Sequence, residues 1–309
     1  MTAEPGRLLT RIDWGTIAPL RLRARTIADG LYAGMHQSRR QGPGVELFGH
    51  RPYVPGDDLR WLDRRALMRH DQLIVRQLET ETDRGLRLII DASASMAYRG
   101  KKAPGSKLAY AALIAAVLAR LATASGDPVG LSFLGGSLAK SLPAMGGREA
   151  FERIVGTLES IDAAGSLHEG DGATEATFAA IAQRARKGTI IVLLSDLLDL
   201  PESAFDRFVA LAPGRTLAAV QILDPDEASF PFEGMLRLKS MEGETVVETD
   251  ASAARARYLE ALAALTEQHR EKLARHGGQL HVANTSDDPA ALVRSIVAGL
   301  AGKPWGGKA

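Results

Sequence analysis

The stretch LRLIIDASAS, residues 86–95, decides the fold. Its first part is apolar apart from Arg87, which is typical of a buried strand. The strand ends at Asp91, and hydroxyl groups follow at every second position, on Ser93 and Ser95. Three side chains that carry oxygen therefore stand in one short run, where their oxygens can face a single point.

Strands and helices alternate along the chain after residue 85. Apolar runs of strand length occupy residues 86–91, 129–134, 137–144, 189–196, 215–224 and 278–285. Segments with helical periodicity occupy residues 106–125, 148–161, 174–188, 203–212, 251–278 and 288–302. This order predicts an α/β fold with a doubly wound, mainly parallel sheet that is covered by helices on both faces. An alternating segment at about 229–249 predicts an inserted β-hairpin.

The segment before this domain, residues 1–84, has a different composition. It is rich in Arg, contains no Lys, and carries the turn sequences RRQGPG and YVPGDD, so we expect irregular structure with one strand near QLIVRQLE. Its apolar side chains are too many for a solvated tail; they include Tyr53, Trp61, Leu62, Leu73, Ile74 and Val75. We therefore expect this segment to pack on the main domain, residues 85–302, and we expect residues 303–309 to form a tail.

Charge and composition restrict the partners and the compartment. The formal net charge is +1, from 38 Lys and Arg against 37 Asp and Glu, which provides no overall field to attract nucleic acid or an anionic membrane. The most apolar segment, residues 108–124, is interrupted by Arg120 and is too short to predict membrane insertion. The N-terminus lacks an apolar stretch of signal-peptide length, and the chain has no Cys. We expect a soluble cytoplasmic protein without a nucleic-acid partner.

Two acids are expected to meet at one edge of the sheet. Asp91 ends the first strand of the sheet and Asp196 ends the fourth, and these strands are neighbours in a common doubly wound order. Two adjacent carboxylates oppose joint ionisation unless a cation lies between them, and the hydroxyls of Ser93 and Ser95 add neutral oxygens. Oxygen ligands suit Mg²⁺ most, with Mn²⁺ or Ca²⁺ as alternatives. A simpler reading is that Asp91 and Ser93 only cap backbone amides at the strand end.

These residues resemble a known site. Asp91, Ser93 and Ser95 resemble the first motif of the metal-ion-dependent adhesion site in von Willebrand factor A domains, and Asp196 resembles the later aspartate motif. GHRPYVPGDDLRWLD followed by VRQLETET is similar to a bacterial von Willebrand A-like family catalogued as domain of unknown function fifty-eight. The resemblance implies a Rossmann-like domain with a family-specific N-terminal segment. It also implies a threonine ligand, and Thr174 in EGDGATEAT is the candidate.

The same resemblance implies a function in binding rather than catalysis. Family members are associated with MoxR-type AAA+ ATPases, so the implied protein is a metal-dependent adaptor for such an ATPase or for its client. Asp57, Asp58 and Arg60 in PGDDLR are candidates for partner contact, although a turn with acids paired to nearby arginines is the simpler explanation. A metal-dependent, phosphatase-like hydrolase that uses Asp91 and Asp196 is the alternative, because an ion between carboxylates can orient water.

Overall fold

The computed structural model describes residues 20–40, 50–52, 74–76, 85–136, 141–167, 172–243 and 246–301. The chain divides into two units. The larger comprises Met1–Tyr32 together with Asp83–Ala309, and the smaller comprises Ala33–Thr82. In the smaller unit, β1 (His50–Pro52) pairs antiparallel with β2 (Ile74–Arg76), so the predicted strand near QLIVRQLE is confirmed.

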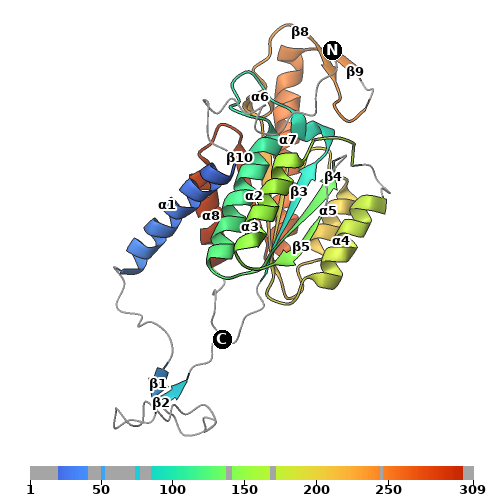
Figure 1. Ribbon diagram of the computed structural model, residues 1–309. Helices are drawn as coiled ribbons and strands as arrows, with labels where there is room; N and C mark the ends of the chain where they lie inside the picture. The colour runs from blue at the N-terminus through green and yellow to red at the C-terminus, as the bar shows by residue number, and fades with distance from the viewer. Residues whose placement is uncertain are drawn as a thin grey trace. The chain divides into compact units, whose positions relative to one another are not determined.

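A six-stranded sheet forms the centre of the larger unit (Figure 1). Its strands in chain order are β3 (Leu86–Ala92), β4 (Val129–Gly135), β5 (Leu142–Met145), β6 (Ile190–Ser195), β7 (Thr216–Leu223) and β10 (Gln279–Asn284). The spatial order is β10-β7-β6-β3-β4-β5, and every pair is parallel except β4 with β5. The predicted α/β fold with a mainly parallel sheet is confirmed, and its first and fourth strands, β3 and β6, are neighbours.

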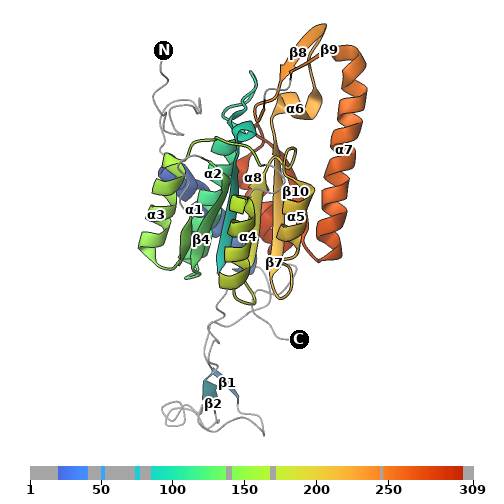
Figure 2. The ribbon, with the colours of Figure 1, turned by 90° about the vertical axis from the view of Figure 1, so that its right-hand side faces the viewer.

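Helices cover both faces of this sheet (Figure 2). One face carries α2 (Lys107–Ala124), α3 (Arg148–Ser160), α8 (Pro289–Ala301) and the first part of α1 (Leu20–Arg40). The other face carries α4 (Gly172–Arg184), α5 (Glu202–Val209) and α7 (Ala251–Arg275). Alternate residues of β3 enter the two cores, with Ile90 on the α2 side and Ile89 on the α4 and α5 side, as expected for a strand buried on both faces.

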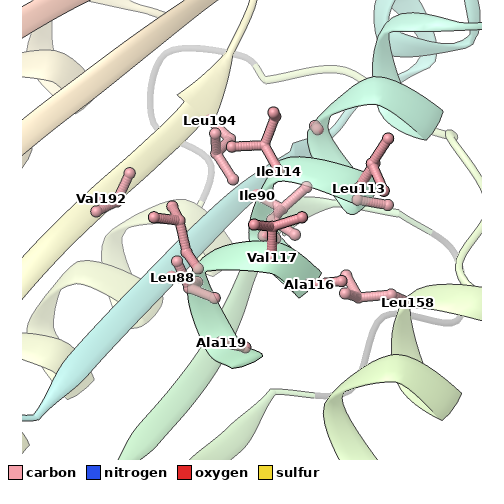
Figure 3. Close-up of a cluster of buried hydrophobic side chains, with 14 of the residues drawn as sticks. Leu88, Ile90, Leu113, Ile114, Ala116, Val117, Ala119, Leu158, Val192 and Leu194 are labelled. Carbon is pink, nitrogen blue, oxygen red and sulfur yellow. The ribbon is translucent and has the colours of Figure 1, made fainter. Parts of the chain in front are cut away.

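Helix α2 is the central helix of the first core. Figure 3 shows Ile114 and Val117 of α2 close to Ile90 of β3, within a cluster that also contains Leu88 and Leu113. The 18 residues of α2 are long and apolar enough to cross a membrane, so the expectation that this segment is too short was wrong. Burial of 78% of the helix inside the fold accounts for its apolar composition instead.

Helix α1 was not predicted, because residues 1–84 were expected to be irregular. Leu20, Ala24, Ala28 and Leu31 recur at helical spacing and are buried in the core beside α2 and α3. Ion pairs from Arg21 and Arg25 to Glu152 of α3, at 2.7 and 2.6 Å, accompany this contact. The arginines between the small apolar residues obscured the helical period in the sequence.

The predicted hairpin is present between β7 and α7. It consists of β8 (Met235–Lys239) and β9 (Val246–Asp250), which pair antiparallel. A short helix that was not predicted, α6 (Pro225–Ser229), connects β7 to the hairpin. Asp224 caps α6, and Glu227 completes a capping box by accepting the Asp224 backbone N–H at 2.8 Å.

Candidate functional site

The carboxyl ends of β3 and β6 bring Asp91 and Asp196 to the same edge of the sheet. The two strands pair in parallel up to Ile90 and Leu194, so Asp91 lies beside Ser195. The Ser195 hydroxyl donates to Asp91 Oδ2 at 2.6 Å. The Ser95 hydroxyl donates to Asp196 Oδ2 at 2.9 Å. The acids that were predicted to meet therefore lie close together, connected through serines.

The two serines of the DASAS stretch lie within the same hydrogen-bonded group. The Ser93 backbone N–H donates to Asp91 Oδ1 at 2.9 Å, and the Ser93 and Ser95 hydroxyl oxygens are 3.1 Å apart. A short 3-10 helix, Ala94–Ala97, turns the Ser95 side chain toward Asp196. The bond from Ser93 is the capping contact that the simpler reading expects, so this bond alone does not indicate an ion.

Burial perturbs the acid at the centre of the group. Asp91 and Asp196 are each 1% exposed. Burial, and secondarily the neighbouring charge of Asp196, raise the pKa of Asp91 to about 7, against hydrogen bonds from Ser195 and Ser93 that favour the ionised form. A cation close to Asp91 would therefore stabilise its ionised form.

A lysine that sequence reasoning missed supplies one such cation. Lys107, the first residue of α2, is fully buried, and its Nζ lies 2.8 Å from Asp196 Oδ2 and 2.6 Å from Glu227 Oε1. Burial by itself lowers the pKa of Lys107, but the charges of Asp196 and Glu227 outweigh it and raise that pKa above its ordinary value. The available signal was a charged residue at the start of a mostly apolar helix that follows the DASAS stretch.

Thr174 lies in the first turn of α4 and is 5% exposed. It lines a cavity of about 480 Å³ together with Gly135, Gly165, Phe133 and other residues. Gly165 accepts a hydrogen bond from the Ala94 N–H at 2.8 Å, and a Cβ on Gly135 would lie 3.0 Å from the Ser93 nitrogen. The cavity therefore borders the DASAS loop, and the role of Thr174 as a ligand stays a prediction.

The donor chemistry suits a hard cation only in part. Carboxylate and hydroxyl oxygens of Asp91, Ser93 and Ser95 are appropriate ligands for Mg²⁺ or Ca²⁺. Asp196 already shares Oδ2 with Lys107. Over the residues that the structure describes, no group of three or more His, Asp or Glu side chains is placed to hold a metal. A cation at Asp91 would thus depend on serine hydroxyls and water for most of its coordination.

The remaining candidates, Asp57, Asp58 and Arg60, lie outside the described residues. The same holds for Tyr53, Trp61, Leu62 and Leu73, on which the predicted packing of the N-terminal segment depends. Both expectations stay predictions.

Comparison with known proteins identifies the family. The model of the family described as "Protein of unknown function DUF58" matches residues 49–272, more than half of the chain. The chain belongs to this family. The uncharacterized proteins Rv1480 of Mycobacterium tuberculosis and Mb1516 of Mycobacterium bovis are each 29% identical to it over 229 residues, which is 74% of this chain and 71% of each relative.

Solved structures of low sequence identity also match this DUF58 chain. BatB from Bacteroides thetaiotaomicron is 21% identical, with a TM-score of 0.47 over 70% of this chain and 98% of that one. An aerotolerance-related membrane protein from Bacteroides fragilis is 18% identical, with a TM-score of 0.45 over the same shares. A von Willebrand factor type A protein from Catenulispora acidiphila is 15% identical, with a TM-score of 0.37 over 69% of this chain and 41% of that one.

Proposed function

We propose that this DUF58 protein is a protein-binding adaptor that uses a divalent cation, most of all Mg²⁺, to hold a carboxylate of its partner. The observation that carries the proposal is the convergence of Asp91, Ser93, Ser95 and Asp196 at one edge of the sheet. An ion held by so few protein oxygens keeps positions for water or for an incoming carboxylate. The cavity lined by Thr174 and Gly135 borders the DASAS loop and would be where such a carboxylate approaches.

The neighbours of the two acids favour binding over hydrolysis. Among the described residues, the hydrogen bonds to Asp91 and Asp196 come from serine hydroxyls, backbone amides and Lys107. Each of these groups holds a carboxylate in place, and none of them is a base at neutral pH. None of these neighbours therefore supplies a base, besides the two acids themselves, that could activate a water molecule.

The proposed partner is a MoxR-type AAA+ ATPase or its client, met in the cytoplasm. Support for this choice comes from the resemblance of the DASAS and PGDDLR stretches to the family associated with these ATPases. A metal-bridged contact would make association switchable, because removing the ion leaves Asp91 and Asp196 facing the partner's acid.

A thermal-stability titration tests the metal. If Mg²⁺ binds only the folded protein, stability rises by about 1.4 kcal/mol for each tenfold increase above the dissociation constant. Asp91→Ala should abolish this dependence, whereas Asp206→Ala, which removes a surface acid paired with Lys272, should retain it. A wild-type melting temperature that does not respond to Mg²⁺, Mn²⁺ or Ca²⁺ would contradict the proposal.

A pull-down from the native host tests the partner. We expect the ATPase to be recovered with wild-type protein in Mg²⁺ and to be lost with chelator or with Asp196→Ala. The two treatments together should have little more effect than either one, because both remove the same contact. Equal recovery in all conditions would mean that docking occurs elsewhere on the protein.

A metal-dependent hydrolase is the second candidate, and one observation favours it. The pKa of Asp91, raised by burial and by Asp196 to about 7, is near the value that suits a general base at neutral pH. Purified protein with Mg²⁺ or Mn²⁺ would then hydrolyse a generic phosphoester, and Asp91→Asn would remove the activity. We expect no turnover from an adaptor.

A further inference from the structure

Lys107 is held between two acids that belong to different parts of the fold. Asp196 follows β6, whereas Glu227 lies in α6 after β7. The lysine is 0% exposed, and burial of an ammonium is costly unless it is paired and hydrogen-bonded. Its two short contacts, 2.8 Å to Asp196 and 2.6 Å to Glu227, meet that requirement.

The contact with Lys107 uses the Asp196 oxygen that an ion at the DASAS loop would need. Asp196 Oδ2 accepts from both the Ser95 hydroxyl and Lys107 Nζ, while Oδ1 accepts from the Leu198 N–H at 3.1 Å. A carboxylate oxygen has two lone pairs, so Oδ2 is fully occupied. A cation can bind this oxygen only if one of the two donors leaves it.

Glu227 gives the ammonium a second acceptor that remains in place. Its Oε2 accepts from the Asp224 N–H at 2.8 Å in the capping box of α6, and its Oε1 accepts from Lys107. Asp224 in turn accepts from the Gly100 N–H at 2.8 Å, which anchors the start of α6 to the segment between the DASAS loop and α2. Lys107 can therefore release Asp196 and keep one charged partner.

We infer that Lys107 is a resident counter-cation which competes with the divalent cation for Asp196, and that Lys107 and Glu227 together set the affinity of the site for that ion. The inference deepens the proposed function and rests on it for the position of the ion at the DASAS loop. A divalent cation that reaches Asp196 drives the ammonium toward Glu227. Without the divalent cation, Lys107 neutralises Asp196 and occupies the Oδ2 position that the ion would need.

Three variants separate competition from a simple charge effect. Lys107→Met removes the competitor, and Glu227→Gln removes the acceptor that draws it away from Asp196. The double variant removes both. Three carboxylates and one ammonium leave two net negative charges in the wild type, and the two carboxylates of the double variant leave the same number. A simple charge effect therefore predicts unchanged affinity in the double variant, whereas competition predicts tighter binding.

Calorimetric titration with Mg²⁺ and with Mn²⁺ measures these differences. We expect the dissociation constant to fall about tenfold or more in the double variant, because Asp196 Oδ2 then keeps only the Ser95 hydroxyl as a donor and has a lone pair available for the ion. Glu227→Gln alone should weaken binding. Asp199→Asn serves as the control, since Asp199 is an exposed acid near Asp196 that makes no ion pair with Lys107 in the described part of the chain, and it should change affinity by much less.

Each outcome decides the inference. Lys107→Met leaves the buried Asp196 and the partly buried Glu227 without their cation and is prone to unfold, so the double variant, whose Gln is neutral, carries the test. Wild-type affinity in the double variant overturns competition while the proposed metal site stands. Binding in the double variant but not in the wild type supports Lys107 as the resident cation and refutes metal dependence of the natural protein. Absence of binding in both overturns the inference and the proposed metal site together.

Discussion

His269 of α7 provides a pH-dependent probe of the core between α5, α7 and the sheet. Its side chain is 5% exposed, its ring centroid lies 4.3 Å from that of Phe205, and its Nδ1 has no hydrogen-bond partner in the described part of the chain. Burial, and then the charge of Lys272, lower the pKa of His269 to about 4, against a smaller opposing effect of Glu202. The imidazole is therefore neutral in the folded protein near pH 7.

The sign of the effect on stability follows from the two pKa values. The folded-state pKa of His269 lies below the unfolded value of about 6.5, so the unfolded chain takes up the proton first as the pH falls. The stabilising contribution of the neutral ring is complete above about pH 6.5 and is lost progressively as the pH falls toward 4. Near pH 5 the linkage relation gives a loss of about 2 kcal/mol, which is an upper value because water reaches part of the site.

Urea denaturation of the wild type and of His269→Leu, near pH 7.5 and near pH 5, measures this loss. The difference in free energy of unfolding, variant minus wild type, should be about 2 kcal/mol more positive near pH 5 than near pH 7.5. Titration of Glu202 and of other acids is common to both proteins and cancels from the comparison to first order. A difference between the two proteins that stays constant across the pH range would refute the buried, neutral state of His269.

Four further changes test the packing. Ile114→Ala in α2 should lower the free energy of unfolding by about 3 kcal/mol in urea denaturation, because the side chain is fully buried. Gly100→Ala should lower the free energy of unfolding measurably, because an added Cβ would collide with a carboxylate oxygen of Asp224. A Cβ added at Gly156 in α3 has no atom within 4 Å, so Gly156→Ala should be neutral or stabilise the fold by up to about 1 kcal/mol. A fragment that begins at Gly85 lacks the buried face of α1, so we expect it to be insoluble; cooperative unfolding of a soluble, monomeric fragment would contradict this.

The architecture was predictable from residue 85 onward because each element is long and strongly patterned. A strand such as Leu86–Ala92, buried on both faces, reads as a continuous apolar run, and α2 begins directly after its capping residue Ser106. Helix α1 was not predicted because its buried residues are small or are separated by arginines. Helix α6 has five residues, too few to show a period, and its identity depends on the capping box that Asp224 and Glu227 form.

The candidate site also has one part that the sequence predicts and one part that it does not. The meeting of Asp91 and Asp196 follows from strand order, which pattern and topology rules supply. The contact of Lys107 with Asp196 and Glu227 depends on the path of one side chain and on the position of a short helix after β7. No spacing in the sequence relates residue 107 to residue 227, so this part required coordinates.

Lys107 changes what the motif at Asp91 implies about charge. A run of acid and alternate serines suggests a metal because two buried carboxylates cannot both ionise without a compensating cation. Here an ammonium compensates Asp196, and Glu227 adds a further negative charge, so the group as a whole stays acidic when all its members are ionised. An additional cation is therefore still attracted, but it must displace a hydrogen bond from Asp196 Oδ2 to gain that ligand. Attraction combined with displacement would give an affinity lower than two free acids provide, as the proposed adaptor requires if its ion is to bind firmly only when a partner's carboxylate completes the coordination.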